Sequence, residues 1–530
     1  MNSEQRSAPA GGAALSRRGF LGAGLGMGTA LILAACGNSA TAGSFDMRGT
    51  PSAGGRLRVG LTGGGATDTL DAHLSVNTTD IARIVNLYDT LLELDHDYNL
   101  RPGLATKAEA TPDGREWTVH LRDDVVFHDG RPMTGRDVKA TFQRITDPEN
   151  PKNGAVDLQP LREIVVVGDH LVRFRLDTPV SYFDRLLAAY TSGIVPVDYD
   201  PQRPVGTGPF RFKSFTASQQ STFTRNEHYW HDDQPYLDEL TILNFNDDDA
   251  LINALLSNQV DAIGQIPPAL VEVLESDPRI DILNSETGSW TPFTMRVDQA
   301  PFDDNRVREA FRLAVDREQM VRQVYSGQGR IGNDMYAPFD RAYSKNLPQR
   351  TQNLDKARRL LADAGYPDGI TVELVTSNIQ AGAVEAAQVF AQQAKGAGIT
   401  VDIRRVEPTT FFGDDYLKWT FAQDFYYTRD FLPQAMTCSL PKSAFNETHM
   451  DNPELTRLVK QATATVDEGP RAELIRRAQK ILYDEGGYIV WGFANQIDAY
   501  QRYVGGLVPD RTGLALSGFR FRQVWLREAL

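Results

Sequence analysis

The sequence has little cysteine and no excess of positive charge. Only Cys36 and Cys438 occur among 530 residues, but a chain of this length can bury sizeable cores without disulfide bonds and has room for about three domains. The 55 lysines and arginines are outnumbered by 69 aspartates and glutamates, which argues against a nucleic-acid-binding protein. After residue 36 no apolar run approaches the ~20 residues that span a membrane. With 41% hydrophobic and 9% aromatic residues, the body of the chain is expected to be folded and soluble.

Several motifs of enzymes and metal sites are also missing. The sequence contains no G-x-x-x-x-G-K-[ST] phosphate loop, no H-E-x-x-H pair, no G-x-S-x-G nucleophile turn and no paired C-x-x-C. His228 and His231 could bind a metal if they lay on a helix. No further ligand cluster accompanies them, which favours a polar turn after a strand. We therefore expect no catalytic residue, no cofactor and no metal site.

The N-terminus has the pattern of an export signal. Arg17 and Arg18 are followed by Phe20 and Leu21 and then by an apolar, glycine-rich stretch that ends at residue 35, which is typical of a twin-arginine signal. The sequence Leu-Ala-Ala-Cys-Gly at 33–37 resembles a bacterial lipobox, in which the cysteine is lipidated and the chain is cut just before it. The alternative is an uncleaved membrane-anchoring helix that ends in a chance cysteine. We predict a signal peptide over 1–35, lipidation at Cys36 and a flexible Gly/Ser-rich tether over 36–55.

Beyond the tether, the hydrophobic pattern is that of an α/β protein. Apolar residues alternate over 117–121, and two β-rich runs flank a Gly-Asp turn within 164–176, which predicts a hairpin. Helical spacing extends over 305–325 and over 354–364. Two strands at 370–374 and 399–403 enclose a helix at 383–394, an order typical of parallel strands joined by a crossover. The hairpin and the crossover predict two lobes of different architecture. The boundary between the lobes is expected near residue 290.

Several segments together resemble a known family. They are residues 86–143, the Gly-Thr-Gly-Pro-Phe run at 206–210, the Arg-Asn-Glu-His-Tyr-Trp run at 225–230, and residues 301–321 and 353–369. In the same order, these blocks are similar to the family 5 extracellular solute-binding proteins, the peptide/nickel-binding receptors of ABC importers. The resemblance covers residues 56–525.

The resemblance implies a two-lobed periplasmic-binding-protein-like fold with the ligand cleft between the lobes. The first lobe would span 56–290 and carry an extra subdomain, the second lobe 291–495, and residues 496–530 would return to the first lobe. Such a monomer binds a solute without chemistry and delivers it to an ABC permease. A lipid on Cys36 would anchor it outside the cytoplasm at the cell membrane.

The nature of the solute is left open by the sequence. The first candidate is a di- or oligopeptide. The second is a non-peptide solute bound by a receptor of the same fold, such as a nickel chelate, an opine or a sugar. A third class of protein, an exported hydrolase, has no catalytic motif to support it.

The resemblance also implies ligand-binding residues in the second lobe. In peptide-binding relatives an aspartate after an aromatic segment pairs with the α-ammonium of the peptide, and Asp430 occupies that place here. The alternative is that Asp430 pairs with neighbouring structure or caps a helix. Tyr427 and Phe431 replace the tryptophan and tyrosine of the commoner pattern, and Arg429 could hold a carboxylate or neutralise Asp430.

Three further aromatic residues lie near the expected crossovers. Trp290, Trp491 and Phe493 could stack on a ligand in the cleft, and packing in the core beneath the hinge is the alternative for each. Trp117, Trp230 and Trp525 belong to framework blocks and are expected in the core.

Overall fold

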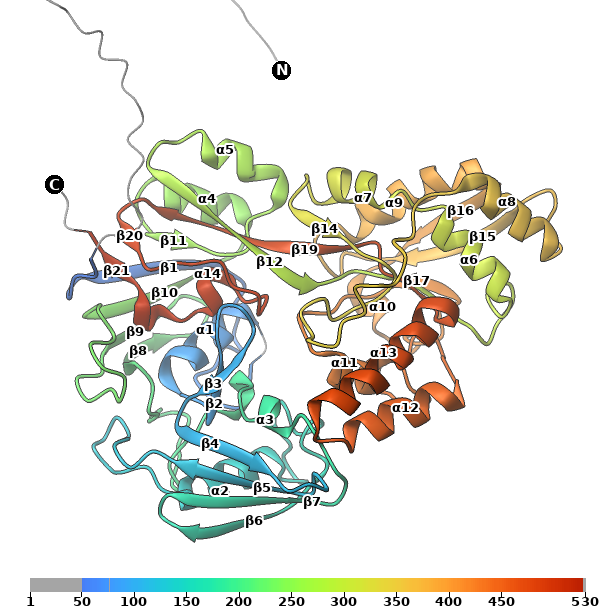
Figure 1. Cartoon of the computed structure of the whole chain (residues 1–530). Helices are drawn as coiled ribbons and strands as arrows, with labels where there is room; N and C mark the ends of the chain where they lie inside the picture. Colours follow the sequence, from blue (N-terminus) through green and yellow to red (C-terminus); the bar gives the residue numbers. More distant parts are fainter. Residues whose placement is uncertain (1–49, 76, 528–530) are drawn as a thin grey trace, which may run out of the picture. The chain divides into compact units, whose positions relative to one another are not determined.

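A computed structural model describes residues 50–75 and 77–527 (Figure 1). The predicted signal peptide with Arg17 and Arg18, the lipidation site Cys36 and most of the predicted tether lie outside the described residues. No helix among the described residues combines the length and apolar character needed to cross a bilayer.

The largest sheet has eight strands in the order β12-β19-β11-β1-β10-β9-β8, with β14 paired to β19. The pairs that β1 forms with β10 and with β11 are parallel, and the other pairs of this sheet are antiparallel. The strands are β1 (Arg56–Thr62), β8 (Phe210–Thr216), β9 (Gln220–Arg225), β10 (Glu239–Phe245), β11 (Ala262–Ile263), β12 (Ile280–Ser289), β14 (Gly329–Ile331) and β19 (Gly492–Gln501).

Helices cover both faces of this sheet. They are α1 (Thr78–Leu87), α4 (Asp248–Leu256), α5 (Val271–Glu275) and α14 (Ala515–Gly518). Leu57, Val59 and Leu61 of β1 are buried in one core, and Leu251 of α4 belongs to the core on the other face. Gly60 permits this packing, because a Cβ atom there would lie 2.8 Å from Leu251 Cδ1.

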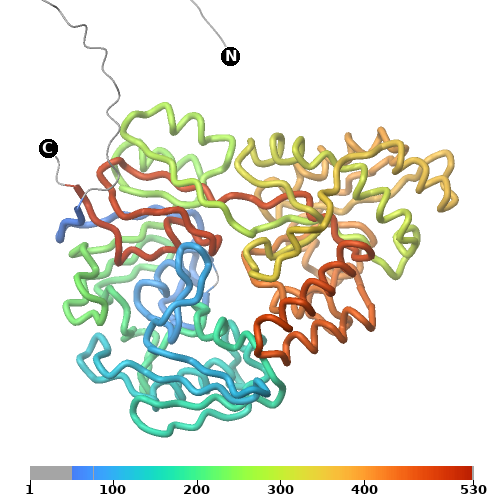
Figure 2. The backbone as a smooth tube through the Cα atoms, in the orientation of Figure 1, coloured from blue at the N-terminus to red at the C-terminus, as the bar shows by residue number. Residues whose placement is uncertain are grey.

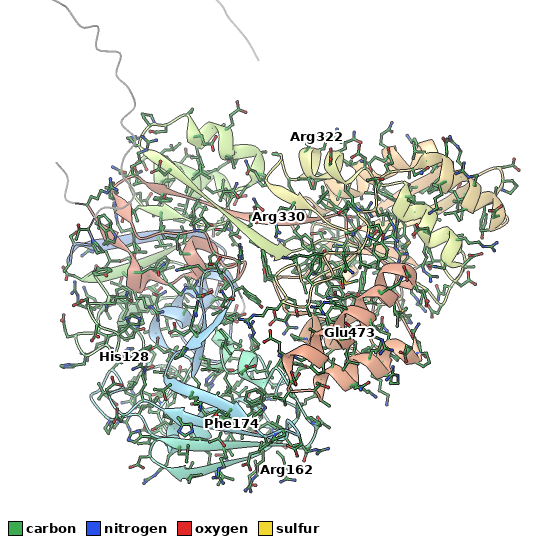
Figure 3. The ribbon with its side chains drawn as sticks, viewed as in Figure 1. His128, Arg162, Phe174, Arg322, Arg330 and Glu473 are labelled. Atoms are coloured by element: carbon green, nitrogen blue, oxygen red, sulfur yellow. The ribbon has the colours of Figure 1, made fainter. Side chains whose placement is uncertain are left out.

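A separate antiparallel sheet, in the order β4-β5-β7-β6, forms a subdomain with α2. Its elements are β4 (Ala105–Ala110), β5 (Glu116–Leu121), α2 (Gly135–Ile145), β6 (Leu161–Gly168) and β7 (Leu171–Leu176), with β2 (Leu92–Leu94), β3 (Leu100–Pro102) and α3 (Phe183–Leu186) beside it in the sequence. Trp117, Val119 and Leu121 are buried on alternate positions, and β6 pairs with β7, so the predicted strand and hairpin are confirmed. Phe174 lies in this core against Phe142 of α2, with ring centroids 5.0 Å apart (Figure 3). We call the large sheet, this subdomain and their helices the first lobe.

The second lobe contains the three-stranded sheet β17-β13-β18, the parallel pair β15-β16 and eight helices between residues 305 and 485. Its strands are β13 (Phe293–Met295), β15 (Ile370–Thr376), β16 (Ile399–Arg405), β17 (Phe421–Gln423) and β18 (Tyr488–Ile489). Its helices are α6 (Asn305–Leu313), α7 (Arg317–Val324), α8 (Leu354–Asp363), α9 (Ala383–Ala394), α10 (Pro408–Phe411), α11 (Phe431–Cys438), α12 (Pro453–Thr463) and α13 (Glu468–Glu485).

The predicted crossover unit is confirmed, because β15, α9 and β16 follow one another and the two strands pair in parallel. The single helix predicted over 305–325 is wrong. It is two helices, because the side chain of Asp316 accepts a hydrogen bond from the Gln319 backbone N–H and caps a new helix, α7.

Two long strands connect the lobes. β12 leads from the first lobe into Trp290 and β13, and β19 returns from Trp491 to pair with both β12 and β11. The last segment, with β20 (Val504–Gly505) and β21 (Trp525–Leu526), packs Phe519 and Phe521 into the same core as β1, and Figure 2 shows it as the red trace beside the blue and green strands. The predicted limits of the lobes at residues 290 and 495 stay predictions.

Candidate functional site

Asp430 reaches from the second lobe to the first. It precedes α11 at the N-cap position, but its side chain makes no cap hydrogen bond. Its Oδ2 atom instead lies 3.0 Å from Nε of Arg185, a residue of α3 in the first lobe. The pair is largely shielded from solvent, with 14% of the Asp430 side chain and 22% of the Arg185 side chain exposed.

The surroundings of Asp430 hold an excess of acid. Burial raises the pKa of Asp430 to about 7, the Arg185 guanidinium opposes this, and the carboxyl groups of Asp340 and Asp184 add to it. Asp340 is held close because its Oδ2 atom accepts a hydrogen bond of 2.8 Å from the backbone N–H of Phe431. Arg185 and Arg471 therefore compensate this carboxylate only in part, and an additional cation would be stabilised beside it.

Arg429 makes a second ion pair between the lobes, in which the second lobe supplies the cation and the first lobe the anion. Its Nη2 atom lies 2.9 Å from Oδ2 of Asp157, in the turn before β6 of the first lobe, and its Nη1 atom donates to Oγ1 of Thr437 at 2.9 Å. Each side chain of the pair is 35% exposed. Two adjacent residues of the second lobe, one acidic and one basic, thus meet an oppositely charged partner from the first lobe.

Thr428 places this segment beside a connecting strand, and Tyr427 lies exposed next to it. The Thr428 side chain accepts a hydrogen bond of 2.8 Å from the backbone N–H of Gly288, in β12. Tyr427 is 54% exposed and meets Phe425 edge to face, with ring centroids 5.8 Å apart. The exposed ring of Tyr427 is available for contact with a ligand.

The other three predicted aromatic residues lie in the core. Trp290 is 2% exposed and stacks between Tyr336 and Tyr426, at centroid distances of 5.3 and 4.7 Å. Trp491 is 0% exposed and donates from its indole N–H to the carbonyl oxygen of Thr291 at 2.8 Å. Phe493 is 2% exposed in the same core as Trp290. The structure does not bring these rings to the exposed surface with Tyr427, and their stacking on a ligand stays a prediction.

The first-lobe partners Arg185 and Asp157 were missed by the sequence analysis. Arg429 and Asp157 are 272 positions apart, and neither first-lobe residue belongs to a motif that could have indicated the pairing.

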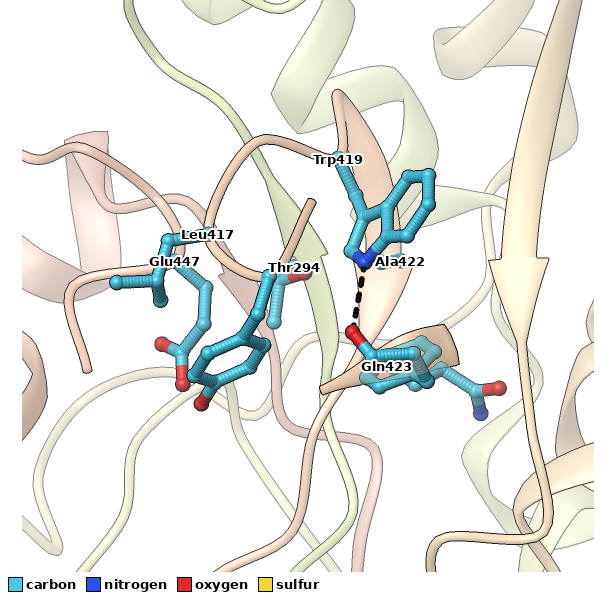
Figure 4. Close-up of a pocket in the computed structure, with 8 residues that line it drawn as sticks. Thr294, Leu417, Trp419, Ala422, Gln423 and Glu447 are labelled. Carbon is cyan, nitrogen blue, oxygen red and sulfur yellow. Dashed lines mark hydrogen bonds between the residues drawn. The ribbon is translucent and has the colours of Figure 1, made fainter. Parts of the chain in front are cut away.

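A buried acid pair was also missed. Asp424 accepts a hydrogen bond of 2.7 Å from the Tyr416 hydroxyl, and Glu447 accepts one of 2.5 Å from Tyr488. Burial raises the pKa of both carboxyl groups, and that of Glu447 is raised further by Asp424. Glu447, Tyr416 and Trp419 line a small cavity of about 10 Å³ in the second lobe (Figure 4), which has room for about one water molecule.

A larger, open hollow of about 320 Å³ lies over β1, β8, β9 and β10 of the first lobe. Its charged side chains are paired with one another or with neighbours, as in the contacts of 2.5 Å from Lys213 to Glu239 and from Arg58 to Asp261. Because these side chains already have ion-pair partners in the protein, their charge does not point to a ligand in the hollow.

His228 and His231 lie in the turn after β9, as the polar-turn interpretation predicted. The neighbouring Tyr229 and Trp230 donate to the buried carboxylate of Asp89 at 3.1 and 2.8 Å. Within residues 50–75 and 77–527, no group of three or more His, Cys, Asp or Glu side chains is arranged to hold a metal ion.

Comparison with known proteins identifies the family. Residues 99–437 match the family described as bacterial extracellular solute-binding proteins, family 5 Middle. The glutathione-binding protein GsiB of Escherichia coli (strain K12) is 25% identical over 484 residues, which cover 87% of this chain and 92% of that protein.

Solved structures show the same fold. The periplasmic binding protein DppA of Helicobacter pylori, in complex with the peptide STSA, is 22% identical with a TM-score of 0.73, covering 90% of this chain and 99% of that one. NikZ of Campylobacter jejuni, in complex with Ni(L-His), is 20% identical with a TM-score of 0.74, covering 88% and 97%. The expected two-lobed periplasmic-binding-protein-like α/β fold is therefore confirmed. The chain belongs to the bacterial extracellular solute-binding proteins of family 5.

Proposed function

We propose that this protein is a receptor for di- or oligopeptides and delivers them to an ABC importer. The carrying observation is the position of Asp430, which is shielded, lies between the lobes and is surrounded by more acid than the nearby arginines balance. A peptide ammonium would supply the missing positive charge in a site from which water is largely excluded. The names of related proteins state glutathione or a peptide as the ligand, and others state agropinic acid or Ni(L-His).

The roles of the other residues follow from their placement. Arg429 would bind a carboxylate of the ligand, and the exposed Tyr427 ring would stack on its backbone or side chains. Trp290, Trp491 and Phe493 would support the site from beneath, because their rings are enclosed by other side chains. The reaction is binding and release, with no chemistry on the solute.

The cellular setting is part of the same proposal. Export through the signal that contains Arg17 and Arg18, followed by lipidation of Cys36, would anchor the monomeric receptor at the outer side of the cell membrane, near its permease. The tether would leave the folded body free to approach that permease.

Isothermal titration calorimetry tests the ligand class. The purified mature protein is titrated with L-alanyl-L-phenylalanine, tetra-L-alanine, reduced glutathione, Ni(L-His)₂, an opine and maltose. We expect saturable binding of at least one peptide and none of maltose. If Ni(L-His)₂, the opine or maltose binds and no peptide does, the peptide proposal is contradicted. The result would favour a receptor of the same fold for a non-peptide solute.

A further inference from the structure

Asp424 and Glu447 form a pair of buried carboxyl groups inside the second lobe. Asp424 directly follows β17, and Glu447 lies in the connection between α11 and α12. The two residues are 4% and 5% exposed, and their carboxyl groups hydrogen-bond to one another. Such a bond requires a proton on one of them, because an ionised carboxylate can only accept hydrogen bonds. We call these two side chains the acid pair.

The other polar groups that face the acid pair are neutral donors. The Tyr416 hydroxyl donates to Oδ2 of Asp424 at 2.7 Å, and the backbone N–H of the next residue donates to Oδ1 at 2.7 Å. Glu447 accepts from the hydroxyl of Tyr426 at Oε1 and from that of Tyr488 at Oε2, the latter at 2.5 Å. Burial raises the pKa of all three tyrosines, so their hydroxyls keep their protons.

A neighbouring thiol is neutral as well. Cys438 of α11 lies close enough to Glu447 for that carboxyl group to act on it, and burial raises the pKa of the thiol to about 12. None of the four side chains that face the acid pair from the neighbouring elements therefore carries a charge at neutral pH.

Basic residues of the connections that enclose the acid pair are engaged elsewhere. Lys418, between α10 and β17, lies 3.7 Å from Asp415. Between α11 and α12, Lys442 is exposed and His449 lies 3.5 Å from Asp298. Among the described residues, neither member of the acid pair has an ion-pair partner, so nothing balances a second negative charge.

These surroundings favour one shared proton. Burial raises the pKa of Glu447 well above its ordinary value, and the adjacent Asp424 carboxyl adds to this. Burial also raises the pKa of Asp424, which the hydrogen bond from Glu447 opposes. The proton thus lies on Glu447, and the two groups titrate as one unit. The cavity of about 10 Å³ beside Glu447 has room for about one water molecule, too little to hydrate two carboxylates (Figure 4).

Tyr426 connects the acid pair to a strand between the lobes. Its hydroxyl donates to Glu447, and its ring stacks on Trp290 with centroids 4.7 Å apart. The backbones of Tyr426 and Trp290 exchange hydrogen bonds of 2.9 and 3.0 Å, and Trp290 directly follows β12. A change at the acid pair therefore reaches the point at which β12 enters the second lobe.

We propose that the acid pair is a proton-binding site that fastens the second lobe beside the end of β12. With one proton bound, the pair stays buried and holds Tyr416 and Tyr426. When that proton passes to solvent, two adjacent carboxylates repel one another, and the connection that carries Tyr416 opens to admit water. This device is independent of the solute that the protein binds.

Infrared difference spectroscopy tests for the proton. The spectra of the wild type, Glu447→Gln and Asp424→Asn are compared in the C=O stretching region of protonated carboxyl groups. We expect the wild type at pH 7 to show a band that Glu447→Gln lacks, and to lose this band as the pH is raised to 9.5. Asp424→Asn should lose it at a lower pH, because the neighbouring negative charge is gone.

Hydrogen exchange tests the opening. Glutamine keeps an N–H donor toward Asp424 and has no proton to lose in this range, so the wild type and Glu447→Gln are compared at equal pH over residues 412–426. We expect equal exchange at pH 6. Above the pH at which the band is lost, exchange should be at least tenfold faster in the wild type. Asp415→Asn is the control, because Asp415 is an exposed acid of the same connection, and it should follow the wild type.

Three results would overturn the proposal. If neither variant removes a carboxyl band at pH 7, the pair holds no proton. If the band survives at pH 9.5, or disappears without faster exchange over 412–426, the proton does not fasten the connection. Should Glu447→Gln fail to fold, the wild type alone decides. Its exchange over 412–426 must then accelerate where the band is lost, while the subdomain with α2 stays protected.

Discussion

Replacing Asp430 by asparagine should separate the ligand role of this residue from a structural one. Asparagine keeps the shape of the side chain and removes its charge. Arg185 would lose its ion-pair partner but keep its hydrogen bond to the Tyr98 carbonyl oxygen. Asp340 and Asp184 would no longer face a third carboxylate.

The size of the effect on stability follows from the pKa of Asp430, about 7 in the folded protein against an ordinary value of 3.8. The folded protein therefore binds this proton more tightly than the unfolded chain does, so the wild type loses stability as the pH rises from about 4 to about 7. One pKa unit corresponds to about 1.4 kcal/mol, so the free energy of unfolding falls by at most about 4 kcal/mol over this pH range. Residual exposure reduces this, and we expect about 1–3 kcal/mol.

Asp430→Asn is neutral at every pH and should escape this loss. We expect it to be close to the wild type in thermal unfolding at pH 4, before most of this loss sets in, and to be more stable at pH 8.5. Its affinity for a peptide should fall well over tenfold at pH 8.5, because removing one partner of a shielded charge pair commonly costs about 2–5 kcal/mol.

Differential scanning calorimetry at the two pH values, with titration calorimetry beside it, measures both effects. Asp484→Asn is the control, because its partner Lys480 lies 2.6 Å away on an exposed face of α13. A mutant less stable than the wild type at pH 8.5, with unchanged peptide affinity, would refute the reasoning and make Asp430 a purely structural partner of Arg185.

The remaining predictions concern the core and the N-terminus. Trp491→Ala should lower the free energy of unfolding by about 3–5 kcal/mol in denaturant titrations, since the ring is fully buried, and a change below 1 kcal/mol would contradict its place in the core. Cys36→Ala should move the protein from the membrane to the soluble fraction, and continued sedimentation with membranes would argue against lipidation. Arg17→Lys with Arg18→Lys should leave precursor in the cytoplasm, whereas normal export would indicate another route.

Local patterns were sufficient to predict the regular parts of the fold. The alternation in β5 and the order of β15, α9 and β16 are set by short stretches of sequence, and both were predicted correctly. The break between α6 and α7 was missed because the apolar spacing continues through it. The extended backbone of Asp316 and the hydrogen bond that its side chain accepts mark the start of the new helix.

The site was only partly accessible to sequence analysis. Asp430 was found through the family resemblance, but its partner Arg185 is brought to it by the packing of the two lobes. Burial of Trp290 and Trp491 was equally undetermined, because an aromatic residue at the end of a strand can face either a cleft or a core. Contacts between distant segments depend on tertiary packing, which local periodicity does not encode.

The solute that the protein carries tests the central claim most directly. The protein is purified from its native host without denaturation, and the small molecules released on unfolding are identified by mass spectrometry. We expect a short peptide or an amino-acid conjugate with a free ammonium and a free carboxylate. A nickel complex without such a ligand, or a neutral sugar, would contradict the account.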